Sequence, residues 1–94
     1  MLKLWGKMIK NNRIIEQYTA EYAKNDLSKS EMVNLCVEEI CREFDIQKPM
    51  WFPLNVKDFA KYGRTVFKAD NFIEEIEFDS FEVELLDDEI EKKR

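Results

Sequence analysis

Carboxylates are the only potentially catalytic side chains that this sequence supplies in quantity. Its 94 residues include 20 Asp and Glu and no His, so the commonest general base and the commonest transition-metal ligand are both missing. Nucleophilic sites built on a Ser-His or Cys-His pair are therefore excluded. Gly6 and Gly63 are the only glycines, too few for a phosphate-binding loop or a dinucleotide fingerprint. We expect a protein that is not an enzyme and holds no cofactor.

The acidic side chains gather between residues 69 and 91, where no basic residue occurs. Within this stretch, segment 74–89 could bind a hard cation or provide an acid and base pair. A calcium loop, however, places its ligands at fixed alternate positions around a central Gly, whereas here Ile76 and Phe78 separate the acids. We therefore expect a solvated face or an acidic docking face and no metal site. A carboxylate-based metal-binding protein or enzyme stays an alternative hypothesis, as does an acidic mimic of nucleic acid.

The two cysteines, Cys36 and Cys41, lie in a stretch that we predict to be helical. Five residues of α-helix turn them about 140° apart around the axis, so they cannot form a disulfide with each other there. Thiols among apolar neighbours are typical of a reducing compartment, where a free Cys behaves as a small hydrophobic residue. No apolar run approaches the roughly 18 residues of a membrane span, and residues 1–10 alternate instead of forming a signal-peptide core. We expect a cytoplasmic protein.

The charge of the chain argues against a nucleic-acid ligand. The formal net charge is −5, and the longest basic cluster is the run 92–94. Nucleic-acid binding needs a patch of Lys and Arg that neutralises phosphates. We therefore expect a protein partner or a second copy of the chain, and neither nucleic acid nor a membrane.

Residues 2–10 and 13–22 alternate between apolar and polar side chains as strands do, with Asn11 and Asn12 between them. Two asparagines tolerate positive φ and suit a type I′ hairpin turn. If Lys10 opposes Arg13, the register sets an aliphatic, an ionic and an aromatic pair across the hairpin, namely Ile9 with Ile14, Lys7 with Glu16, and Trp5 with Tyr18. The other face then carries apolar residues and Ile15, and Gly6 leaves room there for a helix to approach.

Two helices are expected next. Ser28 and Glu31 form a capping-box signature, with Ser30 as a rival cap, ahead of an apolar face that predicts a helix over residues 29–45. Prolines at positions 49 and 53 bracket a loop that contains Trp51 and Phe52. Asn55 can cap a short second helix that ends at Gly63.

The last third of the chain predicts a turn of helix around residues 72–76 and then one strand over residues 81–85. A hairpin in this region would oppose Glu77 to Glu82, which is unfavourable. The strand fits beside residues 2–10, near their lysines, in either a parallel or an antiparallel direction. The predicted fold is an α+β domain over residues 1–86 with the order ββααβ, a small, mostly antiparallel sheet and helices on one face, followed by a charged, frayed tail over residues 87–94.

Four aromatic residues form the candidate interaction surface. Trp5 and Tyr18 give the hairpin a second apolar face, which suggests a partner or a homodimer. Trp51 and Phe52, held between two prolines, are candidate binding anchors, although a loop Trp also serves simply to close a core. We expect a protein-interaction module and, beyond these four residues, no catalytic, cofactor or metal site.

Several segments of the chain resemble a family of small bacterial proteins of unknown function. The resemblance rests on residues 2–7 (LKLWGK), 38–41 (EEIC), 49–51 (PMW) and 70–76 (DNFIEEI). It implies a bacterial, intracellular origin. It implies no activity and assigns no functional residue.

Overall fold

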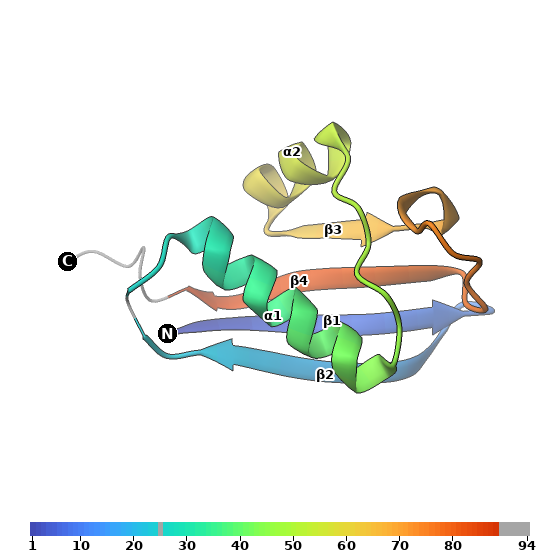
Figure 1. The fold of residues 1–94 in the computed structure, drawn as a ribbon, viewed down its shortest axis with the longest axis horizontal. Helices are drawn as coiled ribbons and strands as arrows, with labels where there is room; N and C mark the ends of the chain where they lie inside the picture. The colour runs from blue at the N-terminus through green and yellow to red at the C-terminus, as the bar shows by residue number, and fades with distance from the viewer. Residues whose placement is uncertain (25, 89–94) are drawn as a thin grey trace.

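The computed structural model describes residues 1–24 and 26–88, which form a four-stranded sheet and two α-helices (Figure 1). The strands are β1 (Leu2–Lys10), β2 (Arg13–Tyr22), β3 (Arg64–Phe67) and β4 (Ser80–Asp88). They lie in the order β2-β1-β4-β3, and every neighbouring pair is antiparallel. Helices α1 (Lys29–Phe44) and α2 (Pro53–Tyr62) pack on the same face of the sheet. The predicted α+β class is therefore confirmed, with one strand more than expected.

The predicted hairpin is present, and its turn has the expected chemistry. Asn11 and Asn12 both have positive φ, 55° and 63°, as a type I′ turn requires. Lys10 opposes Arg13 and Ile9 opposes Ile14, in the expected register.

Beyond these two pairs the predicted register is wrong, because β2 contains a bulge. Ile15 is an extra residue between the partners of Ile9 and Met8, so every later residue of β2 moves to the other face of the sheet. The expected Trp5–Tyr18 and Lys7–Glu16 pairs do not form: Trp5 opposes Thr19, and Tyr18 opposes Gly6. Ile15, expected under the helices, is 49% exposed.

Helix α1 begins and ends close to its predicted limits. The Ser28 hydroxyl accepts a hydrogen bond from the Glu31 backbone N–H, and the Glu31 carboxylate accepts one from the Ser28 N–H, which completes the capping box. Asp45 closes the helix with φ 58°. Helix α2 begins three residues earlier than predicted, because Pro53 occupies its first turn and Phe52, in place of Asn55, is the N-cap. Gly63 ends it with φ 73°, as expected.

The last third of the chain differs most from the prediction. The four-residue strand β3 was not anticipated, and the predicted helical turn around residues 72–76 is absent. A short 3₁₀ helix, η1 (Ala69–Asn71), comes earlier instead. Strand β4 runs antiparallel to β1, which settles the direction that the sequence left open, and it extends to Asp88, past the predicted start of the tail. Residues 89–94 of that predicted tail lie outside the described residues.

The core lies between the sheet and α1. Its fully enclosed members include Leu2 and Leu4 of β1, Ile40 of α1, and Phe81 and Val83 of β4. Gly6 is the expected point of close approach, since a Cβ placed there would lie 2.5 Å from Cγ2 of Ile40. Neither of the two described α-helices covers the opposite face of the sheet (Figure 1).

Candidate functional site

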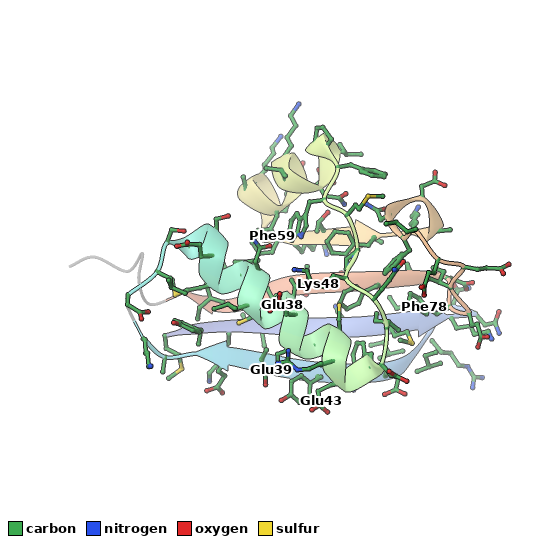
Figure 2. All side chains as sticks on the ribbon, in the orientation of Figure 1. Glu38, Glu39, Glu43, Lys48, Phe59 and Phe78 are labelled. Atoms are coloured by element: carbon green, nitrogen blue, oxygen red, sulfur yellow. The ribbon has the colours of Figure 1, made fainter. Side chains whose placement is uncertain are left out.

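A groove lined mainly by apolar side chains separates α1 from α2. We call it the interhelix groove. Its volume is about 680 Å³, within the usual range for binding sites. Most of its lining is apolar: Val33, Trp51, Val56, Phe59 and Ala60. Lys29, Ser30 and Asn34 complete it, and no acidic residue lines it. Figure 2 shows Phe59 pointing from α2 into this space.

One wall of the groove is α2, which is tied to the sheet. Asn55 is the only buried residue of α2. Its amide Nδ2 donates to the Thr65 hydroxyl at 2.8 Å and to the Val66 carbonyl at 3.0 Å, while its Oδ1 accepts from Asn71 Nδ2 at 2.8 Å. Buried amides bonded in this way fix the backbone around them. The network therefore holds α2 over β3, with its apolar side chains facing a gap.

Trp51 lies at the base of the groove, where it both closes the core and lines the hollow. Its ring meets Phe59 edge-on at a centroid distance of 5.7 Å and Phe67 at 5.0 Å, both favourable aromatic geometries. Phe52, the neighbouring candidate, is 36% exposed and does not line the groove. Of this predicted pair, only Trp51 belongs to the site.

The other predicted pair is divided between the two faces of the sheet. Trp5 lies on the uncovered face, where its Nε1 donates to Gln17 Oε1 at 3.0 Å and Lys7 Nζ lies 4.0 Å from its ring centroid. Tyr18 faces α1 and donates to Glu39 Oε2 at 2.7 Å. That hydrogen bond is the main cause of a raised pKa at Tyr18. The bulge in β2 therefore removes the aromatic pair that suggested an interface.

Two acids of the predicted acidic segment share one lysine within the sheet. Lys7 Nζ lies 3.5 Å from Glu82 Oε2 and 3.3 Å from Glu84 Oε1, and Lys7 is only 9% exposed. This pairing between β1 and β4 follows the expectation that the lysines of the first strand would meet the acids of the last. Asp79 is also engaged, because its Oδ2 accepts from the Asn11 backbone N–H at 2.8 Å.

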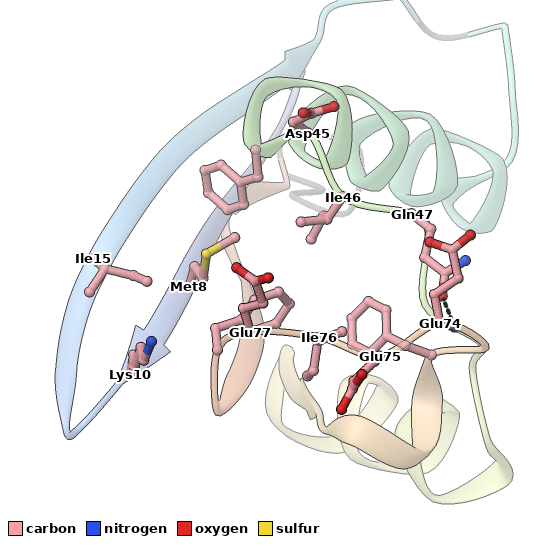
Figure 3. A pocket seen from close by; sticks show the side chains of 13 residues that line it. Met8, Lys10, Ile15, Asp45, Ile46, Gln47, Glu74, Glu75, Ile76 and Glu77 are labelled. Atoms are coloured by element: carbon pink, nitrogen blue, oxygen red, sulfur yellow. Dashed lines mark hydrogen bonds between the residues drawn. The ribbon is translucent and has the colours of Figure 1, made fainter.

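Glu74, Glu75 and Glu77 of this segment rim a second hollow, shown in Figure 3, which we call the acidic-rimmed pocket. Its volume is about 450 Å³. The apolar lining consists of Met8, Ile15, Phe44, Ile46, Phe72, Ile76 and Phe78. The polar lining consists of Lys10, Asp45, Gln47, Glu74, Glu75 and Glu77. Within the described ranges, no three carboxylate, thiol or imidazole groups converge as a metal site.

The cysteines are the remaining candidate nucleophiles, and their surroundings suppress their reactivity. Cys36 and Cys41 are both free and buried. Burial raises the pKa of Cys36 to about 11 and that of Cys41 to about 12. Only the thiolate is a strong nucleophile or metal ligand, so both side chains act as core residues.

The sequence prediction missed most of the groove. The two predicted helices contain Val33, Val56 and Phe59, but nothing in the sequence placed these helices apart. The structure supplies the reason, because the only buried residue of α2 is the polar Asn55, which contacts the sheet.

Comparisons with known proteins leave the geometry as the main guide to function. No protein-family model matches the chain, and no curated protein or solved structure is significantly similar to it. The resemblance to a bacterial family therefore stays a prediction. Among the described residues, no helix is long and apolar enough to cross a membrane.

Proposed function

We propose that this chain is a non-enzymatic protein-interaction module of a bacterial cytoplasm, and that it binds an amphipathic helix of a partner protein in the interhelix groove. The observation that carries the proposal is the exposed apolar lining between α1 and α2. Val56 is 56% exposed although it faces this groove. A helix laid in a groove by its apolar face is a common mode of peptide recognition.

The aromatic and aliphatic lining supports a side-chain anchor. Trp51 and Phe59 offer ring surfaces at the bottom, with Val33 on one wall and Val56 on the other. Anchors that fill such pockets contribute most of the affinity of an interface. We therefore expect one or two apolar side chains of the partner helix to enter the groove.

The charge of the groove favours acidic flanks on the partner helix. Lys57 lies exposed on the turn of α2 beside the groove, and the described residues that line the groove include no acid. Complementary charge at the rim of an interface mainly sets specificity and the association rate. The preferred ligand is an amphipathic helix with an apolar stripe and acidic residues beside it.

The proposal is tested by the affinity of a fluorescein-labelled model helix of about 15 residues, with leucines on one face and glutamates along the flanks. Fluorescence anisotropy would compare Val56→Glu with Leu54→Glu. Both positions are exposed and apolar on α2, but only Val56 lines the groove. We expect Val56→Glu to weaken binding roughly ten-fold or more, because it places a carboxylate against the apolar stripe. Leu54→Glu should bind like the unmodified protein.

Equal loss in the two variants, or equal binding of a scrambled peptide without an apolar face, would contradict the proposal. Light scattering of the protein alone tests the alternative that a second copy of the chain occupies the groove. If the chain dimerises and Val56→Glu makes it monomeric, the groove is occupied by a second copy and not by another protein.

A further inference from the structure

The acidic-rimmed pocket is separate from the interhelix groove and has a different chemistry. We propose that it is a second docking site, which takes a basic segment of a partner protein carrying one apolar anchor side chain. The groove meets α1 at Val33, whereas the pocket meets it at Phe44. Eleven residues of α-helix separate these positions by about 16 Å. The two sites can therefore be occupied independently.

The floor of the pocket is made of apolar side chains from three parts of the chain. Met8 comes from β1, Phe44 from the end of α1, and Phe72 and Phe78 from the loop before β4. Phe72 and Phe78 meet edge-on, with centroids 5.7 Å apart. Figure 3 shows Ile46 and Ile76 on opposite walls of the open space. A side chain that entered would exchange water for apolar contact on several sides.

Hydrogen bonds hold the walls of the pocket in place. The Glu74 backbone N–H donates to Gln47 Oε1 at 2.8 Å, which joins the loop after α1 to the loop before β4 (Figure 3). The Asp79 backbone N–H donates to the Ile9 carbonyl at 2.8 Å, and this bond anchors the second loop to the hairpin. A site that is already formed avoids much of the cost of ordering on binding.

The rim is strongly acidic and has little internal compensation. Four carboxylates face one ammonium group: Asp45, Glu74, Glu75 and Glu77 against Lys10. Elsewhere in the described structure, carboxylates such as Glu82 and Glu38 have a lysine partner within 4.0 Å, but none of these four does. Cations on both sides of an apolar anchor would complement this rim.

These features together select the class of ligand. A metal ion would need converging carboxylates, which the described residues lack. A wholly apolar ligand would leave the rim carboxylates without a cationic partner. A polycation without an apolar anchor would leave the apolar floor exposed to water. A short peptide segment with an aromatic or aliphatic residue between arginines or lysines satisfies both the floor and the rim.

The test uses a peptide with a central phenylalanine between two arginines on each side, labelled for anisotropy. Two comparison peptides replace the phenylalanine by alanine, or the arginines by glutamates. We expect the alanine peptide to bind roughly ten-fold or more weakly, from the lost burial of one aromatic side chain. The glutamate peptide should not bind. Binding should weaken as salt rises from about 0.01 M to 0.15 M.

The protein variants separate this pocket from the general negative charge of the chain. Glu75→Gln with Glu77→Gln removes two rim charges, and Glu21→Gln with Glu43→Gln removes two exposed charges elsewhere. The rim variant should bind about three- to thirty-fold more weakly, as expected for the loss of two surface ion pairs. The control variant should bind normally, and both should melt near the temperature of the unmodified protein.

Equal weakening in both variants would show that the peptide reads only net charge, and would overturn the proposal. Equal binding of the alanine and phenylalanine peptides would overturn it as well, because the pocket floor would then be unused. Val56→Glu, which places a carboxylate in the interhelix groove, should leave this binding unchanged. That result keeps the second site distinct from the first.

Discussion

At the scale of single residues, Cys36 and Cys41 show how packing decides chemistry. Both thiols are buried, with pKa values raised to about 11 and 12. We predict that neither reacts measurably with iodoacetamide at pH 8 in the folded protein, because very little thiolate is present there. Both should react after unfolding in guanidinium. Mass spectrometry counts the adducts, and alkylation of the native protein would contradict the assignment.

The raised pKa values of the two thiols also predict that the folded state loses stability at alkaline pH. A thiol whose pKa is raised by folding stabilises the folded state below the unfolded pKa, which is near 9.0. This contribution is lost as the pH rises through about 11 for Cys36 and about 12 for Cys41. We therefore expect the melting temperature of the unmodified protein to fall above pH 9 more steeply than that of a Cys36→Ala, Cys41→Ala variant.

Gly6 is the residue at which the sheet and α1 come closest. An added Cβ would meet Cγ2 of Ile40 at 2.5 Å and Cε1 of Phe81 at 3.3 Å, and both neighbours are fully enclosed. We predict that Gly6→Ala lowers the free energy of unfolding by about 1–3 kcal/mol through overpacking. Chemical denaturation measures this change. Thr19→Ala on the uncovered face is the control, and we expect it to change stability by less than about 0.5 kcal/mol.

At the scale of elements, the sequence predicts the parts that local rules determine. The Asn11–Asn12 turn, the capping box of α1 and the stop at Gly63 all follow from backbone preferences of one to four residues, and all are present. The bulge at Ile15 has no such local signal. The bulge is favoured because it shifts the register of β2. The shifted register brings Tyr18, Ala20 and Tyr22 toward α1 in place of Gln17 and Thr19.

Strand β3 and the placement of α2 could not be predicted from the sequence, because both depend on tertiary contacts. Four residues are too few to show a period, and their buried partners come from distant parts of the chain. Asn55 was predicted as a cap, yet its amide joins α2 to β3 and to Asn71 of η1. Such a role depends on tertiary contacts that no local pattern reports.

The asparagine network gives a prediction for α2 as an element. Asn55→Ala leaves the Asn71 amide and the Thr65 hydroxyl without their shared partner in a buried site. We expect a loss of about 2–4 kcal/mol in the free energy of unfolding, from several unsatisfied polar groups. Urea denaturation would measure it beside Asn34→Ala, an exposed amide on α1. Similar values for the two variants would refute the network as the tie of α2 to the sheet.

At the scale of the whole molecule, charge on the uncovered sheet face is balanced internally. Lys7 is enclosed by Trp5, Glu82 and Glu84. We predict that Lys7→Met lowers the free energy of unfolding by about 1–3 kcal/mol, since two carboxylates lose their cation in a partly buried place. Lys3→Met, whose ion pair with Glu21 is longer and more exposed, is the matched control. Thermal denaturation would compare the stabilities of the two variants. Equal stability of Lys7→Met and Lys3→Met would contradict the prediction.

The two hollows lie on the helix side of the molecule, and of the predicted surface only Trp51 reaches one of them. Of the acidic segment, Glu74, Glu75 and Glu77 rim the pocket and Glu82 and Glu84 pair within the sheet, a division set by the antiparallel return of β4. The two tryptophans have the same chemistry but different places in the fold. Trp51 lines the interhelix groove, whereas Trp5 lies on the uncovered face of the sheet. These two tryptophans are the only ones in the chain, and they report on opposite faces of the molecule.

The most direct test of the proposed function uses Trp51 fluorescence in a Trp5→Phe background. Addition of the acidic amphipathic helix should shift the emission of Trp51 to shorter wavelength and saturate, because the partner would cover the half-buried ring in the interhelix groove. The reciprocal Trp51→Phe protein, which retains Trp5, should show no shift. A helix that leaves Trp51 emission unchanged, or moves Trp5 emission equally, would contradict the groove as the binding site.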